Sequence, residues 1–310
     1  MASSVFERRI DRVRAIIDNY GLFFICGAPK SGTTWLQKAL DAHSQVVCAG
    51  EGHFADMFIR KLAGPIKQYF LHQRIVTKNV YEGEGYYRHQ PSEQFAFLAT
   101  SFILDAFSRL QIPSGTRFIG DKTPANVEHL ELLHHLFPDA KIINIVRDGR
   151  DALTSTFKHV ERVSRRDGAR ANSDAFLLER TGFYSSRWVK AVESADRFGV
   201  KYPGMLHTVR YEDLKQDFAS AFSGVVDFLG ASISPQEVAR CEAETSFKRM
   251  SGGREPGDEN PTAFLRKGIV GDWRASLGPG HLEIFNRVGA DWLVRLGYES
   301  APTRSAIETG

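Results

Sequence analysis

The chain has 310 residues, of which 42% are hydrophobic and 25% are charged, proportions that exclude a globally disordered chain. Lys and Arg number 40 against 37 Asp and Glu, and a net charge of only +3 does not indicate a nucleic-acid-binding protein. The three cysteines, Cys26, Cys48 and Cys241, show no CxxC spacing, so neither a disulfide framework nor a zinc site is expected.

The N-terminal segment is interrupted by charges every few residues and lacks the apolar region of a signal peptide. No stretch approaches the roughly 20 apolar residues that a membrane-spanning helix needs. With an odd number of cysteines, these features predict a protein of the reducing cytoplasm that has no membrane span.

The first half of the chain alternates compact apolar runs with helical patterns. In chain order the patterns predict a helix over 5–19, a strand over 22–26, a helix over 35–42, irregular to helical structure over 51–115 with a clear helix at 95–110, a strand over 117–122 and a helix over 127–137.

The second half continues the alternation. The patterns predict a strand over 141–146, helices over 151–160 and 174–198, a strand beginning at 205, and helices over 218–229 and 235–244, with a polar surface loop at 251–261. This order predicts an α/β fold in which helices flank a central parallel sheet. We expect a single domain over residues 1–300 and a loose C-terminal tail at 301–310.

The most informative segment is the Gly-rich loop 27–35, Gly-Ala-Pro-Lys-Ser-Gly-Thr-Thr-Trp, which lies between a buried strand and a helix. Gly27 and Gly32 keep the Gly-x4-Gly spacing of a Walker A loop, whose backbone N–H groups converge on a phosphate. The Walker lysine position is Thr33, and Lys30 lies inside the loop instead. The segment therefore predicts a three-layer fold like that of P-loop NTPases, with a phosphate cradle suited to something other than ATP hydrolysis.

A second anion site is indicated where the strand 141–146 ends at Arg147, with Ser155 eight residues later on the next expected helix. A cation at the carboxyl end of a strand faces the crevice in which open α/β sheets bind ligands. The alternative is a charged turn in which Arg147 pairs with Asp148 or Asp151. Asp148 is also a conceivable metal ligand, but the flanking arginines favour an anion, so no metal is expected.

Three later strings complete the pattern: YEDLKQD at 211–217, TSFKRM at 245–250 and FLRKGIVGDWR at 264–274. With PKSGTTW, they resemble in order and spacing the motifs of the sulfotransferases that use 3′-phosphoadenylyl sulfate (PAPS). The resemblance implies sulfuryl transfer to a hydroxyl or amine of a small molecule, glycan or peptide, with adenosine 3′,5′-bisphosphate (PAP) as product.

The resemblance also implies the nucleotide-binding residues. The phosphosulfate loop would contribute Lys30, Ser31, Gly32, Thr33 and Thr34, and Trp35 would stack on the adenine. Arg147 and Ser155 would bind the 3′-phosphate. The later strings would contribute Tyr211, Ser246, Phe247, Arg266, Lys267 and Gly268.

The expected proton acceptor differs from that of the cytosolic enzymes, which carry a histidine in a KTHLP-like string. Here residues 120–124 read Gly-Asp-Lys-Thr-Pro, which looks more like the tyrosylprotein and Golgi carbohydrate enzymes, several of which use a glutamate. We therefore expect Glu51 as general base, with Lys122 and Lys30 stabilising the transferring group. His53 and Asp121 are the alternatives.

Two other functions fit parts of this pattern. A P-loop kinase or nucleotide phosphotransferase would use the same strand, loop and helix, but it needs a Walker lysine and Mg²⁺. A binding module without activity would retain the anion sites and lack a proton acceptor. Neither the acceptor substrate nor the oligomeric state follows from the residues.

Overall fold

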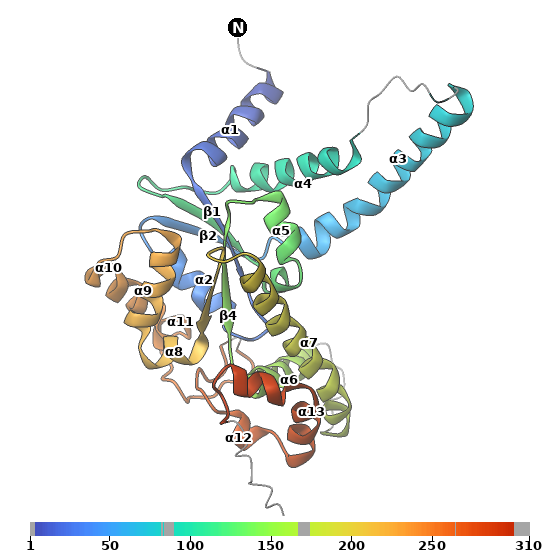
Figure 1. Cartoon of the computed structure of the whole chain (residues 1–310). Helices are drawn as coiled ribbons and strands as arrows, with labels where there is room; N and C mark the ends of the chain where they lie inside the picture. Colours follow the sequence, from blue (N-terminus) through green and yellow to red (C-terminus); the bar gives the residue numbers. More distant parts are fainter. Residues whose placement is uncertain (1–3, 82, 84–89, 167–173, 264, 301–310) are drawn as a thin grey trace, which may run out of the picture.

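The computed structural model of the chain describes residues 4–81, 83, 90–166, 174–263 and 265–300. Its centre is a five-stranded parallel sheet in the order β2-β3-β1-β4-β5 (Figure 1). In chain order the strands are β1 Gly21–Cys26, β2 Val46–Ala49, β3 Phe118–Lys122, β4 Lys141–Val146 and β5 Leu206–Arg210. Because β2 and β3 lie on one side of β1 and β4 and β5 on the other, the strand order reverses at β1, where open α/β sheets bind ligands.

Both faces of the sheet are buried, because successive residues of each strand point to opposite faces. In β1, Phe24 and Cys26 enter one apolar cluster, whereas Phe23 and Ile25 enter the other. The alternation explains why the strand appears in the sequence as a continuous apolar run.

Two layers of helices cover these faces. One face packs against α2 Thr33–Asp41, α8 Tyr211–Gln216, α9 Phe218–Leu229 and α10 Pro235–Glu244. The other packs against α1 Val5–Asn19, α4 Pro91–Phe107, α5 Leu130–Leu136, α6 Gly149–Arg166, α7 Asp174–Lys201 and α13 Pro279–Arg295.

The remaining helical elements are shorter or lie at the margin. They are the π-helix η1 Phe54–Ile59, α3 Arg60–Val80, the 3₁₀ helix η2 Pro124–Glu128, α11 Phe247–Met250 and α12 Trp273–Ser276. In Figure 1, α3 extends outward from the body of the molecule. Among the described residues, no helix is both long enough and apolar enough to cross a membrane.

The expected α/β fold with a central parallel sheet flanked by helices is confirmed. The predicted helix over 127–137 divides at His129 into η2 and α5. Five elements were not predicted: the four-residue edge strand β2, the 17-residue helix α13, and the short helices α8, α11 and α12. The tail expected at 301–310 lies outside the described residues.

Candidate active site

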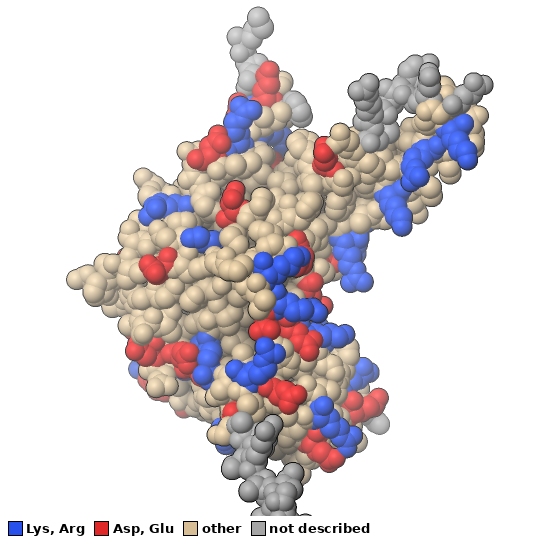
Figure 2. All heavy atoms as spheres, in the orientation of Figure 1, with Lys and Arg blue, Asp and Glu red and all other residues tan. Residues whose placement is uncertain are grey.

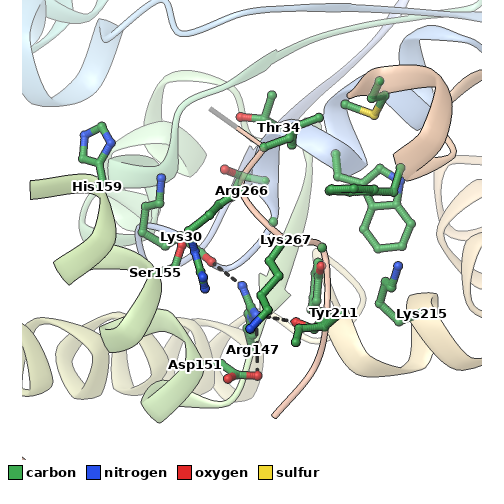
Figure 3. Close-up of a pocket in the computed structure, with 18 of the residues that line it drawn as sticks. Lys30, Thr34, Arg147, Asp151, Ser155, His159, Tyr211, Lys215, Arg266 and Lys267 are labelled. Carbon is green, nitrogen blue, oxygen red and sulfur yellow. Dashed lines mark hydrogen bonds and ion pairs between the residues drawn. The ribbon is translucent and has the colours of Figure 1, made fainter. Parts of the chain in front are cut away.

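The carboxyl ends of β1, β3 and β4 open into a cavity of about 420 Å³ (Figure 3). Residues from seven separate segments line it, within 29–35, 51, 124, 147–159, 211–215, 245–250 and 265–272. Of the site residues predicted from the sequence, the cavity is lined by Lys30, Gly32, Thr33, Thr34, Trp35, Glu51, Arg147, Ser155, Tyr211, Phe247, Arg266, Lys267 and Gly268.

Loop 27–32 is shaped by close packing against β4 and α8. Gly32 caps α2 with a φ of 100°, and a Cβ there would lie 2.6 Å from the Tyr211 ring, so only glycine fits. Lys30 adopts a left-handed φ of 72°, which is uncommon for a residue with a side chain. This local strain is typical of functional sites.

Lys30 lies in loop 27–32 and lines the cavity. In Figure 3 its side chain rises from the loop toward His159 on α6. Burial, together with the positive charges of Arg162 and Arg147, lowers the pKa of Lys30 to about 8, although Glu51 opposes the shift. A bound anion would relieve this desolvation and repulsion, so the loop is arranged to receive negative charge.

Aromatic side chains form the opposite wall. Trp35 donates its indole N–H to the Thr245 carbonyl at 3.0 Å and meets Tyr211 edge to face at 5.4 Å. Gly268 has a φ of 65°, and a Cβ there would overlap the ring of Phe247. The pocket therefore combines a flat apolar wall, suited to a purine, with cationic ends.

Arg147 lies at the junction of three elements. Its guanidinium packs 4.4 Å from the centre of the Tyr211 ring and donates to the Ile269 carbonyl at 3.0 Å. The Arg147 Nη2 atom is 3.5 Å from Asp151 Oδ2. The pairing of Arg147 with Asp151 that a charged turn would have is therefore present, and both residues lie in the cavity wall. Arg147 Nε is buried without a hydrogen-bond partner in the described structure, which leaves it available to an anion.

Asp151 ties the first turn of α6 to the C-terminal segment. Its buried carboxylate accepts hydrogen bonds from the backbone N–H groups of Gly271 at 2.7 Å and Trp273 at 3.0 Å. With the Arg147 contact, these bonds fix the 266–273 segment against the carboxyl end of β4. From the sequence, Asp151 was predicted only as a possible ion-pair partner of Arg147.

Two further cations lie on this segment. Arg266 forms an ion pair with Asp272 and another with Glu259 at 2.7 Å, and Lys267 Nζ lies 2.9 Å from Asp272 Oδ1. The carboxylates occupy the hydrogen-bonding groups that a phosphate would engage. An incoming phosphate must therefore compete with Asp272 for both cations.

Glu51 lies at the end of the cavity nearest Thr34 and Lys122. Its Oε1 atom accepts a hydrogen bond from Lys122 Nζ at 2.6 Å, and its Oε2 atom is 3.3 Å from His53 Nε2. Lys122 is 4% exposed and also donates to Thr34 Oγ1 at 3.3 Å. These contacts hold a 43% exposed carboxylate beside the phosphate loop.

The two alternative proton acceptors, His53 and Asp121, contact Glu51 or the loop that carries it. His53 contacts Asp56 Oδ2 at 2.9 Å through Nδ1, and this hydrogen bond raises the pKa of His53. Asp121 is buried and accepts from the Gly52 N–H and the Thr123 hydroxyl, both at 2.8 Å. Asp121 therefore orders the loop that carries Glu51 rather than facing the cavity, and burial raises the pKa of Asp121 to about 6.

Comparison with known proteins identifies the family. A model of the sulfotransferase family matches residues 23–235, more than half of the chain. The chain belongs to the sulfotransferase family. The match includes the phosphate loop, Glu51, Lys122 and Arg147, and it ends before the Phe247 and Arg266 segments.

Curated members of the family are distant relatives of this sulfotransferase-family chain. Sulfotransferase 1A1 of Bos taurus is 26% identical over 207 residues, covering 61% of this chain and 68% of its own. The 3-beta-hydroxysteroid sulfotransferase of Cavia porcellus is 27% identical, covering 52% and 60%. Protein-tyrosine sulfotransferase 2 of Gallus gallus is 26% identical, covering 69% and 52%.

Solved structures agree in fold. Mouse sulfotransferase SULT7A1 complexed with PAP superposes with a TM-score of 0.52 at 18% identity, covering 92% of this chain and 88% of its own. The sulfotransferase domain of the Synechococcus olefin synthase also gives 0.52 at 18% identity, covering 92% and 97%. The expected sulfotransferase family and fold class are therefore confirmed.

Three predicted site residues do not line the cavity of this sulfotransferase-family chain. Lys122 lies just behind Glu51, and Ser31 is fully buried with an Oγ that has no hydrogen-bond partner in the described structure. Ser246 is exposed and caps α11, accepting from Arg249 N–H at 3.4 Å. Its role in nucleotide binding stays a prediction.

The sequence did not predict four charged or titratable residues of the cavity wall, namely Asp151, His159, Lys215 and Asp272. Asp151 accepts hydrogen bonds from the backbone of residues 271 and 273, and Asp272 pairs with Arg266 and Lys267. His159 follows Ser155 by one helical turn, so its position on the same face of α6 could have been inferred from spacing. Lys215 lies 5.6 Å from the Trp35 ring centre. The contacts of Asp151 with residues 271 and 273 have no local signal in the sequence.

Proposed function

We propose that the chain transfers the sulfuryl group of PAPS to an acceptor hydroxyl or amine and releases PAP. The observation that carries the proposal is the separation of cationic groups around one aromatic-walled cavity. Lys30 belongs to loop 27–32, Arg147 follows β4, and Arg266 and Lys267 belong to the 265–272 segment, so these cations reach the cavity from three different parts of the chain. An adenosine with phosphate groups at both its 5′ and 3′ positions has this distribution of charge.

The residues fit such a ligand. Arg147 lines the cavity, and its buried Nε atom has no hydrogen-bond partner among the described residues, so a bound phosphate would supply an acceptor for this donor. Trp35 and Phe247 offer flat surfaces for the adenine ring. Thr33, Thr34 and the N-terminus of α2 would bind the 5′-phosphate through hydroxyl and backbone donors.

The proposed chemistry is a direct in-line transfer. Glu51 would accept the proton of the acceptor hydroxyl as the acceptor oxygen forms its bond to sulfur. Lys30 and Lys122 would stabilise the electron pair left on the bridging oxygen when the S–O bond of PAPS breaks. The proton that Glu51 takes from the acceptor hydroxyl is released to solvent after PAP leaves.

His53 is proposed as a positioning residue. Its Nε2 contact holds Oε2 of Glu51 on the side opposite Lys122, and Asp56 fixes the ring. Reorientation of Lys122 toward the transferred group would free Oε1 of Glu51 for the acceptor proton. No metal is proposed for this mechanism. The described residues contain no cluster of three or more potential metal ligands.

The acceptor class stays open within the proposal. The relatives include enzymes named for a hydroxysteroid and for protein tyrosine, so a small molecule, a glycan or a peptide is proposed here. We also propose a cytoplasmic enzyme, supported by three buried cysteines that are free thiols.

A single domain over residues 1–300 is likewise proposed. It is supported by the apolar cluster that joins Phe24 of β1 with Phe285 and Leu293 of α13. A C-terminal helix that shares its core with the first strand would not fold as a separate unit.

The test is transfer of labelled sulfate from PAPS to phenols, sugars, lipids and tyrosine peptides, with and without EDTA. We expect at least one acceptor to be sulfated and the rate to be unchanged by EDTA. Loss of activity in EDTA, with phosphate transfer from ATP, would favour the nucleotide phosphotransferase. Absence of turnover despite tight PAP binding would favour a binding module.

A further inference from the structure

The feature that the proposed activity leaves unexplained is α3, Arg60–Val80, which we call the α3 arm. It extends away from the sheet and its flanking helices in Figure 1. Phe70 is the one side chain of this 21-residue helix that is buried. Most of the other side chains of this helix are exposed.

The α3 arm carries a row of cations. Arg60, Lys67, Arg74 and Lys78 are exposed and, at 3.6 residues per turn, lie within about 40° of one another around the helix axis. Figure 2 shows Lys and Arg side chains along one edge of the arm. None of the four forms an ion pair within the described ranges, and residues 57–81 contain no Asp or Glu.

Large aliphatic side chains lie on the same face. Leu71 is 54% exposed and Ile75 is 50% exposed. Their spacing from Lys67 places them between the cations, because positions i, i+4 and i+8 lie on one side of a helix. The face is thus both cationic and apolar along its length.

We propose that the α3 arm binds an anionic lipid surface, with Lys67, Arg74 and Lys78 at the phosphate level and Leu71 and Ile75 inserted among the acyl chains. A helix with interspersed cations and aliphatic groups fits such an interface. Long Lys and Arg side chains let the helix sink while their charged ends stay hydrated. The inference concerns binding alone and does not depend on the proposed sulfuryl transfer.

The charge and the exposed aliphatic side chains of this face disfavour two other binding partners, a second copy of the chain and an acidic polymer. A second copy bound through the same surface would place the four cations against themselves, since a two-fold interface is self-complementary. An acidic polymer would satisfy the cations but leave Leu71 and Ile75 in water. An anionic bilayer satisfies both at once.

The test is sedimentation of the full chain with vesicles of phosphatidylcholine alone or mixed with phosphatidylserine, at low and physiological salt. We expect binding to the mixed vesicles that weakens with salt, and at least tenfold weaker binding to phosphatidylcholine alone. The variant Lys67→Gln/Arg74→Gln/Lys78→Gln should bind roughly a hundredfold more weakly. The control Arg12→Gln/Arg14→Gln/Lys190→Gln removes the same charge from exposed positions elsewhere and should bind nearly as wild type.

Leu71→Ser/Ile75→Ser should retain weak, salt-sensitive binding and lose the part that survives physiological salt. Equal binding to both vesicles, no binding, or an equal loss in the control would overturn the proposal. Binding to polyglutamate without binding to vesicles would assign the face to an acidic polymer and contradict it. The wild-type chain can also be tested by sedimentation equilibrium. If it is a dimer there and Leu71→Ser/Ile75→Ser dissociates that dimer, the face binds a second copy of the chain, and the proposal is contradicted.

Discussion

Glu51 is held by nitrogen atoms on both sides, Lys122 Nζ at 2.6 Å and His53 Nε2 at 3.3 Å. An amide in its place could keep one hydrogen bond from Lys122 but could not accept a proton. Glu51→Gln should therefore lower the sulfuryl transfer rate by about 10²–10⁴-fold. PAP affinity, measured by calorimetry, should stay within about twofold of wild type, because Glu51 is not among the residues proposed to bind the nucleotide. Transfer at a near-normal rate would exclude Glu51 as the base.

The lowered pKa of Lys30, to about 8 instead of the usual 10.5, predicts a proton linkage. A bound phosphosulfate or phosphate should raise the pKa again, so PAP binding near pH 8 should take up as much as about half a proton. Calorimetry in buffers with different ionisation enthalpies measures this uptake. Lys30→Met should abolish it, and an uptake that persists in this variant would contradict the assignment.

Asp121 predicts a pH dependence of stability. Burial raises the pKa of Asp121 from 3.8 to about 6, so between these values the folded chain holds a proton that the unfolded chain has released. The contribution of Asp121 to stability is therefore present below about pH 4 and is lost as the pH rises through about 6. Relative to wild type, Asp121→Asn should gain up to roughly 3 kcal/mol of unfolding free energy over this range.

Urea unfolding of both proteins at several pH values tests this expectation. A constant difference between Asp121→Asn and wild type from pH 4 to 6 would show that Asp121 ionises normally.

At the scale of elements, the junction between α6 and the 266–273 segment depends on one carboxylate. Asp151 joins Arg147 to the N–H groups of Gly271 and Trp273. Asp151→Asn weakens this junction and leaves Arg147 without its ion-pair partner. PAP affinity should fall by about tenfold to a hundredfold, because a hydrogen bond to a charged group contributes about 1.5–3 kcal/mol.

The matched control is Asp196→Asn on α7. Asp196 forms a surface ion pair with Arg295 at 3.2 Å, and pairs of this kind contribute little to stability. PAP affinity of this variant should equal that of wild type. Equal affinities for Asp151→Asn and wild type would mean that the 266–273 segment does not depend on Asp151.

Elements with a strong local pattern could be predicted from the sequence, and those defined by distant partners could not. Helices 218–229 and 235–244 match α9 and α10 because apolar periodicity and Ser or Asp caps mark them. The strand β2 was missed because Val46–Ala49 is only four residues long. Its pairing with β3, more than 70 residues away, defines it as a strand.

The candidate site shows the same limit. Loop 27–35 and Arg266-Lys267-Gly268 could be found because their residue types are contiguous. The contact of Glu51 with Lys122 crosses from the end of β2 to the end of β3, and that of Asp151 with Gly271 spans 120 positions. Such contacts depend on strand order, which the sequence pattern did not specify.

At the scale of the whole molecule, the order β2-β3-β1-β4-β5 brings the two inferred anion sites to one edge of the sheet. Loop 27–32 follows β1 and Arg147 follows β4, and these neighbouring parallel strands pair from Phe23 to Cys26. The C-terminal segment then covers the same edge with Arg266 and Lys267. The arrangement accommodates a nucleotide with phosphates at two separate positions.

The central claim is that this cavity distinguishes adenosine 3′,5′-bisphosphate from ATP. Isothermal titration calorimetry of the full chain with PAP, and separately with ATP and magnesium, tests it most directly. We expect PAP to bind without metal at least a hundredfold more tightly than ATP with magnesium, because Thr33 replaces the Walker lysine and Arg147 is proposed to bind a 3′-phosphate. Tight binding of ATP with magnesium and no detectable heat with PAP would contradict the account.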